Sequence, residues 1–475
     1  MFNSVADVKR RWDTTEIVQY EERDPCYTWL YPLDLGDFDV RGIWGESPVP
    51  RFNNRLTLYF HIPFCKFICK MCPFTHTPAR RKVIERYVDA LCKEIEFYGT
   101  TLPGLEEKQV STIYFGGGTA STLTPEQMTR ILLVVKRHYT LMDDCQLTLE
   151  CHPRTVDKNY LKQMKETGIN RVSFGIQSFN HSIIQSFNHS IIQSFNQQYI
   201  DQLHLHQKIE QSRQIITDAK ALGFDSVGID LMYRYAGQDV ESLEAELNQV
   251  FELGVDTLSA YALDAEVRSL DSIAERQKSI EHEREMFYYI NQKLEDAGYQ
   301  HVAQPDYGKV GKVNRQIIDL WGAPQVENLS FGAGAFSEVY NGHTWANIHD
   351  PDKYIEFIEQ DQLPIVFGQK HNIDDAMSRY PALGVRCLSF SFEAFDQAFG
   401  VEFEAVFQHE LARLIAKGWI EIEGKTLRVT REGKFFIDNI SKTFFNTRNR
   451  GKSQIWAVQV ENLLPDNVFK FKDVL

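Results

Sequence analysis

Three cysteines lie close together in a chain that is otherwise poor in cysteine. Cys65, Cys69 and Cys72 follow the spacing C-x3-C-x2-C, whereas the other five cysteines are scattered over 475 residues. Three thiolates on one short loop suit a [4Fe–4S] cluster whose fourth iron stays open to a ligand. A structural zinc site is the alternative, because His76 stands four residues beyond Cys72. The spacing therefore predicts a metal centre, and an open iron would make it a binding site.

A second group of candidates stands at the ends of apolar segments. Gly117 and Gly118 close one segment, Glu150 and Gln177 close two others, and Asp230 lies within a fourth. Taken alone, the glycines fit an ordinary turn and Glu150 fits a solvated charge. Asp230 is flanked by apolar residues, and a buried charge is costly unless it is paired or bound to a ligand. Asp230 is therefore predicted to be functional.

The segments that would position these residues alternate between strand and helix patterns. Short apolar or alternating runs that end in Gly, Pro or polar residues predict strands, and helical patterns lie between them. One helix opens with Thr-Pro-Glu, a typical start signal. The predicted strands are 55–62, 110–118, 145–153, 169–177, 226–233 and 257–263, and helical patterns include 83–99 and 124–139.

This alternation predicts an α/β fold built from parallel β/α units. Six units fit an incomplete parallel (β/α)6 barrel better than an open sheet. In parallel barrels the chemistry gathers at the carboxyl ends of the strands. The cysteine triplet and the candidates named above all stand at or near such ends, so we expect five successive strands to bring them to one edge of the barrel.

Five motifs resemble one known family in order and spacing. They are the cysteine loop HIPFCKFICKMCPF, then YFGGGTAS, LECHP, RVSFGIQSFN and GIDLMY. They are similar to the radical S-adenosylmethionine (SAM) superfamily, and within it to the oxygen-independent coproporphyrinogen III oxidase (HemN-type) family. The resemblance, which spans most of the chain, implies a radical SAM barrel and an enzyme that cleaves SAM reductively. A 5′-deoxyadenosyl radical would then abstract hydrogen from a porphyrinogen or a related organic substrate.

The resemblance also implies which residues bind the cofactors. Cys65, Cys69 and Cys72 would ligate the [4Fe–4S] cluster, and one or two SAM molecules would bind beside it. Glycines suit this place because a backbone without Cβ atoms can approach a ligand closely. The implied partners are a tetrapyrrole or another conjugated organic substrate, and an external electron donor such as flavodoxin or ferredoxin. The residues expected at SAM are Tyr59, Met71, Gly117, Gly118, Thr119, Glu150, Gln177 and Asp230.

The chain departs from the family pattern in four places. Phe74 stands where these oxidases carry a fourth cysteine, and Met71 replaces the aromatic residue between the second and third cysteines. RYAGQD, at residues 234–239, replaces a GLPGQT-like stretch, and Leu205 stands where an arginine is expected. Histidines beside Leu205 copy the bidentate fork of an arginine poorly. Two alternatives therefore stay open: a methyl- or methylene-transferring enzyme that uses two SAM molecules, and a heme chaperone.

Composition narrows the remaining possibilities. The chain is 43% hydrophobic and 24% charged with a net charge of −14, which is ordinary for a soluble globular protein and unfavourable for nucleic-acid binding. No apolar run of about 18 residues occurs, and the N-terminus lacks the apolar core of a signal peptide. We therefore expect a monomeric cytoplasmic protein that binds neither nucleic acid nor membrane.

Four segments are predicted along the chain: an N-terminal arm over 1–54, the partial barrel over 55–300, a barrel extension and linker over 301–375, and a C-terminal domain over 376–475. The last shows the order helix, Gly-Trp, strand, Glu-Gly-Lys turn, strand, helix, which is typical of a winged-helix-like module. On so acidic a protein we interpret this module as a substrate cover rather than a DNA reader.

An eight-residue block, QSFNHSII, occurs twice from Gln177 and begins a third time at Gln193. Removing the sixteen residues 177–192 restores the family spacing. The repeat is therefore interpreted as an insertion by duplication, since a repeat architecture has a longer period and at least about three units. We expect Gln177, which continues its strand, to keep the cofactor side, and Gln185 and Gln193 to be displaced.

Overall fold

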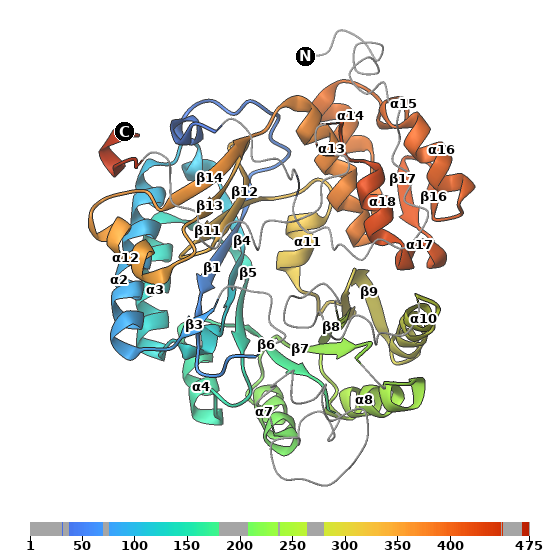
Figure 1. Ribbon diagram of the computed structural model, residues 1–475, viewed down its shortest axis with the longest axis horizontal. Helices are drawn as coiled ribbons and strands as arrows, with labels where there is room; N and C mark the ends of the chain where they lie inside the picture. Colours follow the sequence, from blue (N-terminus) through green and yellow to red (C-terminus); the bar gives the residue numbers. More distant parts are fainter. Residues whose placement is uncertain are drawn as a thin grey trace.

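A curved sheet of twelve strands forms the centre of the molecule (Figure 1). The computed structural model describes residues 31, 38–69, 76–179, 208–235, 238–263, 280–447, 449 and 468–474. Six adjacent strands run parallel and follow one another in chain order. This confirms the predicted α/β fold with six parallel β/α units. The strands are β1 (Arg55–Ile62), β4 (Gln109–Gly117), β5 (Thr140–Cys151), β6 (Arg171–Gln177), β7 (Ser226–Tyr233) and β8 (Thr257–Ala262).

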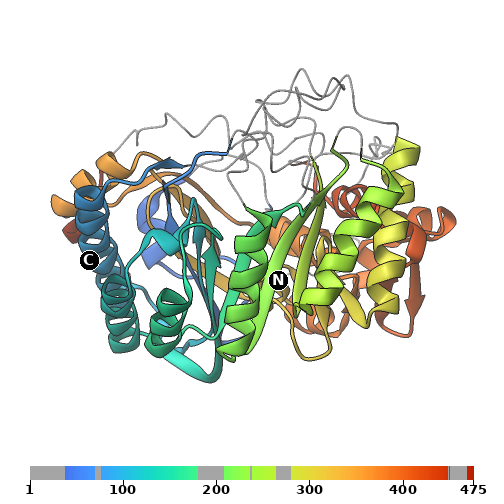
Figure 2. The ribbon, with the colours of Figure 1, turned by 90° about the horizontal axis from the view of Figure 1, so that it is seen from below.

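Helices between the parallel strands form an outer layer along one face of this sheet (Figure 2). They are α2 (Arg81–Thr101), α3 (Pro125–His138), α4 (Lys158–Thr167), α7 (Ile209–Ala221), α8 (Val240–Leu253) and α10 (Ile280–Asp296). The predicted start of α3 is confirmed: Thr124 caps it in a capping box with Gln127, and Pro125 occupies its first turn.

The predicted strand bounds are correct for β1 and β7 and wrong for the start of β5. The sequence predicts this strand from residue 145, but it begins at Thr140. Residues 140 and 141 pair with Gln109 and Val110 before a register shift. Asp143 and Asp144 interrupt the apolar pattern there, so the sequence pattern alone does not predict this part of the strand. It becomes a strand by pairing with β4.

The sheet continues beyond the parallel strands at both edges. On the β1 side, β11 (Glu327–Phe331) pairs in parallel, and β12 (Phe336–Tyr340), β13 (His343–Asn347) and β14 (Ile365–Lys370) follow antiparallel. On the β8 side, β10 (Asp306–Lys309) and β9 (Tyr299–Ala303) add an antiparallel pair. The helices of this region are α11 (Arg315–Trp321) and α12 (Pro351–Glu359).

The parallel strands turn apolar side chains toward the helices and polar side chains toward the opposite face. Phe60 stacks between Phe115 and Phe331 at ring distances of 4.8 and 5.1 Å, and Tyr98 of α2 contacts Phe331. The alternate residues are polar, and α11 covers them at the amino ends of β1 and β4, where Thr112 donates to Gln316. The six strands therefore enclose a polar interior.

The described part of the N-terminal arm packs on both regions of the fold. Val40 and Ile43, from the short helix η1 (Val40–Trp44), are buried in the core of the sheet, and Trp44 donates to Thr101 over 3.2 Å. Tyr31 is buried instead among the aromatic residues of the C-terminal region.

The C-terminal region forms a second apolar core beside α11 and β9 (Figure 1). Its three-stranded antiparallel sheet has the order β15-β17-β16. The predicted helix, strand, turn, strand, helix order is confirmed by α16, β16, β17 and α17. The elements are α13 (Ile373–Gly384), η5 (Val385–Cys387), β15 (Ser389–Ser391), α14 (Glu393–Phe399), α15 (Phe403–Val406), α16 (Gln408–Ala416), β16 (Ile420–Glu423), β17 (Thr426–Val429), α17 (Arg431–Phe435) and α18 (Ile437–Thr443).

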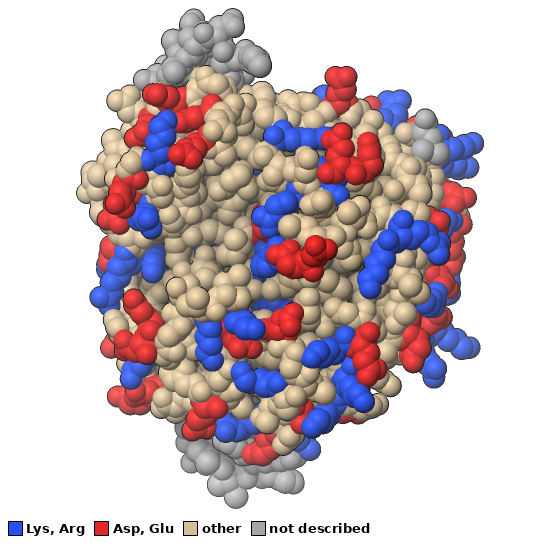
Figure 3. All heavy atoms as spheres, turned by 180° about the vertical axis from the view of Figure 1, so that it is seen from behind, with Lys and Arg blue, Asp and Glu red and all other residues tan. Residues whose placement is uncertain are grey.

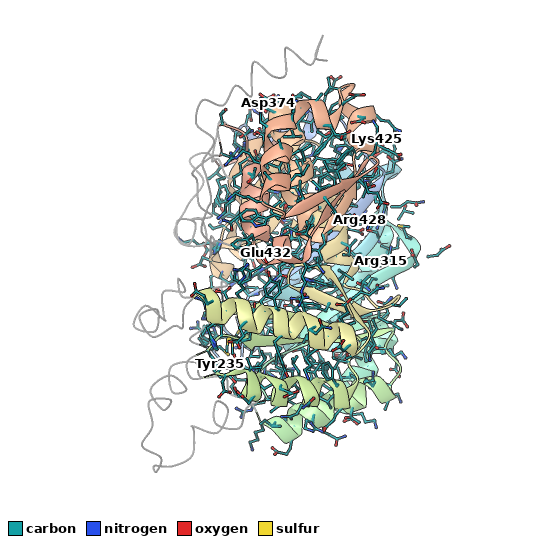
Figure 4. The ribbon with its side chains drawn as sticks, turned by 90° about the vertical axis from the view of Figure 1, so that its right-hand side faces the viewer. Tyr235, Arg315, Asp374, Lys425, Arg428 and Glu432 are labelled. Atoms are coloured by element: carbon teal, nitrogen blue, oxygen red, sulfur yellow. The ribbon has the colours of Figure 1, made fainter. Side chains whose placement is uncertain are left out.

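Two polar contacts hold this region against the sheet. Fully buried Arg386 donates to Asp438 over 2.7 Å and to the Gln304 carbonyl over 2.9 Å, and its guanidinium lies over the Trp321 ring. Glu432, at the boundary with α10 in Figure 4, pairs with Arg284 and accepts a hydrogen bond from Tyr288 over 2.6 Å. The C-terminal region is thus fixed to the barrel at two points.

A buried carboxylate ties α2 to the β11 edge of the sheet. Glu94 accepts hydrogen bonds from the Gly332 amide at 2.9 Å, the Asn347 amide group at 2.7 Å and the Tyr354 hydroxyl at 2.6 Å. Burial raises the pKa of Glu94 to about 7, although these three donors oppose the rise.

We expect Glu94→Ala to lower the melting temperature far more than Glu96→Ala on the exposed side of the same helix. The first change leaves three buried donors without an acceptor, at a cost of about 1 to 3 kcal/mol each before relaxation. Thermal unfolding of the two variants measures the difference. Equal melting temperatures would show that water replaces Glu94 without loss.

Candidate functional site

The first cysteine of the triplet lies at the carboxyl end of β1, as the sequence predicts. Cys65 ends the two-residue strand β2 (Phe64–Cys65), is 8% exposed, and accepts a hydrogen bond from Thr119 at 3.4 Å. Burial raises the pKa of the Cys65 thiol, and the hydrogen bond opposes this. Cys69 follows in the same loop and is partly exposed. Met71, Cys72 and Phe74 lie outside the described residues.

The cysteine loop is held by a short parallel pairing. β2 pairs with β3 (Thr77–Pro78), so that the Pro63 and Cys65 carbonyls accept from Thr77 and Ala79 at 2.7 and 3.0 Å. Within the described residues no three His, Cys, Asp or Glu side chains are arranged to hold a metal ion, and the triplet has its third member outside them.

The glycine turn after β4 meets this loop directly. Gly117 has φ +110°, a conformation that other residues rarely adopt, and the Gly118 amide donates to the Ile62 carbonyl over 2.9 Å. A Cβ atom on Gly118 would lie 2.8 Å from the Pro63 carbonyl and 3.0 Å from the Cys65 sulfur. The turn and the cysteine loop can pack this closely only because residue 118 has no side chain.

Tyr59, Tyr114 and Glu150 form the first part of the polar interior. The rings of Tyr59 and Tyr114 stack at 6.0 Å, and Tyr114 donates to Glu150 over 2.6 Å. Burial raises the pKa of Glu150, while the hydrogen bonds from Tyr114 and from the Gly117 backbone lower it. Gly116 leaves the space between these residues, since a Cβ there would lie 3.0 Å from Glu150.

Asp230 continues the polar interior on the other side of β6. It is the register partner of Gly175 on β6 and of Ser259 on β8, and Ser259 donates to Asp306 of β10 over 2.6 Å. Burial first, and then the charges of Glu150 and Asp306, raise the pKa of Asp230 to about 8, while Arg171 opposes the rise. Three carboxylates therefore share one interior.

Arg171 supplies the positive charge of this interior. Its side chain is 3% exposed and crosses from β6 to β8, where Nη2 donates to Thr257 over 3.1 Å. Nε and Nη1 have no hydrogen-bond partner in the described part of the chain. The crossing needs Gly228 on the intervening strand, because a Cβ there would lie 3.0 Å from Nη2.

Gln177 is the last residue of β6, with a strained φ of +64°. Its side chain accepts a hydrogen bond from Tyr261 of β8. A buried carboxylate fixes the backbone that follows: Glu246 accepts from the Ser178 hydroxyl at 2.7 Å and from the Phe179 amide at 2.9 Å. Gln177 therefore continues its strand, whereas Gln185, Gln193 and Leu205 lie outside the described residues.

The other departures from the family pattern surround the loop after β7. Arg234 has φ +66° and pairs with Glu283 of α10, and its amide donates to Gln238 over 2.6 Å. Asp239 caps α8 through a capping box with Ser242. The described residues of this stretch thus anchor α8 and α10 to the end of β7.

Sequence reasoning missed four residues of this interior: Tyr114, Arg171, Tyr261 and Asp306. The first three lie in predicted strands, but two-residue alternation acts only within one strand. Tyr114 and Tyr261 share the face of Tyr59 and Asp230 through the register of β4 with β1 and of β8 with β7. Asp306 lies in β10, a strand that the sequence did not predict, so no pattern pointed to it.

The fold and the site have clear relatives. Residues 59–249 match the radical SAM superfamily, and residues 374–436 match the HemN C-terminal domain. The chain therefore carries a radical SAM domain followed by a HemN C-terminal domain. Its cofactors are those of that superfamily, a [4Fe–4S] cluster and SAM.

Curated relatives carry two different names. An oxygen-independent coproporphyrinogen III oxidase of Salmonella typhimurium is 27% identical over 461 residues, covering 91% of this chain and 95% of the relative. A heme chaperone, HemW of Bacillus subtilis, is 25% identical over 393 residues, covering 81% of this chain and 98% of the relative.

A solved structure has the same fold. Coproporphyrinogen III oxidase (HemN) from Escherichia coli, described as a radical SAM enzyme, superposes with a TM-score of 0.71 at 22% identity. The superposition covers 88% of this chain and 94% of that chain. It confirms the predicted architecture of a parallel α/β sheet with a C-terminal helical domain.

The residues present fit these cofactors. The described cysteines stand on the loop at the end of β1, the glycine turn leaves backbone open beside Cys65, and the interior carries the Glu150 carboxylate. Within the described residues, Nε and Nη1 of Arg171 are also left without a hydrogen-bond partner in this interior, as a site for a polar ligand requires.

We expect Gly118→Ala to reduce iron and sulfide incorporation on reconstitution and to lower the melting temperature. The added Cβ would press on the Pro63 carbonyl and the Cys65 sulfur, an overpacking worth about 1 to 3 kcal/mol. Gly45→Ala is the matched control, because Gly45 has φ −89° and the nearest atom to its Cβ position is 3.4 Å away. Normal iron content in Gly118→Ala would contradict the close approach.

Asp230 should make the protein less stable as pH rises. Its folded pKa, about 8, lies above its ordinary value, so stability is greatest at low pH and is lost as pH rises toward 8. Asp230→Asn removes this ionisation. Between pH 6 and pH 9 the free energy of unfolding of the variant should therefore rise relative to that of the wild type by roughly 2 kcal/mol, and its melting temperature should rise accordingly.

Thermal unfolding of cofactor-free protein across that pH range measures the gain. Asp143→Asn, at an exposed position of β5, should follow the wild type at every pH. A difference in melting temperature between Asp230→Asn and the wild type that stays constant with pH would show that the pKa of Asp230 is not raised into this range.

Proposed function

We propose that the chain is a radical SAM enzyme that acts on a porphyrinogen, or on another conjugated organic substrate, inside the parallel strands. The observation that carries the proposal is the shared edge: the cysteine loop, the glycine turn and the inward carboxylates lie at the ends of successive strands. A structural zinc site would not need the carboxylates and the arginine that face the interior.

Cys65, Cys69 and Cys72 would hold the cluster. Gly117, Gly118 and Thr119 would meet the methionine end of SAM, and Tyr59, Met71, Glu150, Gln177 and Asp230 would contact the rest of it. Stacked Tyr59 and Tyr114 support this assignment, because Tyr114 orients the Glu150 carboxylate toward the interior. The hydrogen bond from the Tyr261 hydroxyl fixes the orientation of the Gln177 side chain, as the bond from Tyr114 fixes that of Glu150.

The cluster and SAM, held by these residues, would supply the radical chemistry of the reaction. The chain's own groups bind and orient the substrate. Asp306 offers acceptor oxygens to N–H groups such as those of pyrroles, and Arg171 balances part of its charge. Ser259 keeps Asp306 turned into the interior.

The C-terminal region, predicted as residues 376–475, would cover the substrate. Support comes from its two fixed contacts with α10 and with the segment before β10, which place it beside the β8 and β10 side of the sheet. An external electron donor such as flavodoxin or ferredoxin would reduce the cluster.

A heme chaperone is the second candidate, because the chaperone relative aligns over 98% of its own length. The oxidase relatives align over more of this chain, 91% against 81%, which favours an enzyme of the longer form. Methyl or methylene transfer is a third outcome that the same assay detects.

We expect anaerobically reconstituted protein to convert SAM to 5′-deoxyadenosine when dithionite and coproporphyrinogen III are supplied, with a decarboxylated tetrapyrrole detected by mass spectrometry. Cys69→Ala should lose both its iron absorbance and the product, because one thiolate ligand is missing. Cys92→Ala, on the outer helix α2, should retain both.

Other product patterns decide between the alternatives. Deoxyadenosine together with S-adenosylhomocysteine would assign methyl or methylene transfer. Retained heme without either SAM product would assign the chaperone. A Cys69→Ala variant that kept its iron and its activity would overturn the cluster assignment.

A further inference from the structure

The segment around the cysteine loop is basic in a strongly acidic chain. The net charge is −14, yet no acidic residue occurs between Glu46 and Glu85, while seven lysines and arginines do. Two of these, Arg51 and Arg55, bond to Asn341 and Asp319. The local excess of positive charge therefore comes from the residues that flank the cysteines.

The fold gathers these cations at the cysteine loop. Ala79 donates to the Cys65 carbonyl over 3.0 Å, which brings Lys66 beside Arg80 at the start of α2. Arg154, from the loop after β5, lies 4.4 Å from the Phe67 ring. Together with exposed Arg81 and Lys82 they make up the basic rim: Lys66, Arg80, Arg81, Lys82 and Arg154.

The acidic residues nearest in sequence cancel only part of this charge, through the effect of Glu85 on Arg81. Glu85 accepts from Gln127 and pairs with Arg130, and Asp157 accepts from the Tyr160 amide as the cap of α4. Lys66, Arg80 and Lys82 form no ion pair with any other described residue. The next arginine along α2, Arg86, is paired with Glu359.

An apolar centre lies within the basic rim. Ile68, between the first two cysteines, is 42% exposed and is one of five large hydrophobic side chains that are exposed among the described residues. Phe67 beside it packs between His152 and Arg154. An exposed apolar centre surrounded by charged side chains is the arrangement of a protein interface.

We propose that the basic rim and Ile68 form the docking surface for a small acidic protein that carries single electrons. This inference rests on the proposed function, which needs an electron at Cys65 and Cys69. Acidic and basic side chains are interspersed on the face shown in Figure 3. Because the net charge is −14, an acidic carrier would be repelled by the chain as a whole and steered to this rim.

Charge reversal at the rim should weaken binding of an oxidised flavodoxin to the reconstituted protein. Arg80→Glu with Lys82→Glu is the main variant, since acidic residues at the start of α2 favour the helix and preserve folding. We expect affinity to fall by about tenfold or more, and wild-type affinity to fall between about 50 and 300 mM salt. Lys66→Glu should weaken binding as well.

Lys136→Glu is the matched control, because Lys136 is exposed in the last turn of α3, at the opposite end of the barrel. Its flavodoxin affinity should stay within about twofold of the wild type. Rim variants that bind flavodoxin as the wild type does, or binding that is indifferent to salt, would overturn the docking surface. So would tighter binding of a DNA oligonucleotide than of flavodoxin.

A second measurement separates this inference from the proposed function. Deoxyadenosine formation driven by dithionite should be equal in the wild type and in Arg80→Glu with Lys82→Glu, while formation driven by reduced flavodoxin should fall in the variant. Failure of the dithionite reaction in the wild type would contradict the proposed enzyme, whereas the binding measurement would still test the surface.

Discussion

Polar side chains face the inside of the six parallel strands, and because they are buried each of them needs a hydrogen-bond partner. The opposite face of the same strands carries the apolar core, in which Phe60 stacks between Phe115 and Phe331. Parallel strands are usually apolar on both faces. Here Tyr114, Glu150, Asp230 and Arg171 occupy the inner face, so the interior is suited to a polar ligand rather than to apolar packing.

Buried carboxylates also bind polar groups at the edges of the site. Glu246 gathers donors from the end of β6 and from the loop after β7, and Glu94 does the same between α2 and the loop after β11. Each carboxylate accepts several hydrogen bonds from segments that are distant in sequence. Desolvation raises their pKa values, but the donors keep the strand ends in place. Buried hydrogen-bond acceptors therefore hold the strand ends in position.

Close approach of backbone segments defines the cysteine end of the site. A Cβ atom on Gly116, Gly117 or Gly118 would lie 2.8 to 3.0 Å from Glu150, His61 or Cys65, which is closer than nearly all side-chain contacts. The same end carries the basic rim. A scaffold shared by oxidases and heme chaperones does not choose between them, so the choice depends on what the proposed substrate groups, Asp306 and the C-terminal region, bind.

The sequence by itself determined the six β/α units, the cysteine loop, the glycine turn and the placement of Glu150, Gln177 and Asp230 near strand ends. These features are local: periodicity, turn residues and motif spacing are read within one segment. The extension of β5 to Thr140, the strands β9 to β14, and the partners Arg171, Tyr261 and Asp306 were decided only by the tertiary structure. Their signals depend on pairing across strands, and a side chain such as Arg171 becomes a site residue only when Gly228 on the neighbouring strand lets it cross.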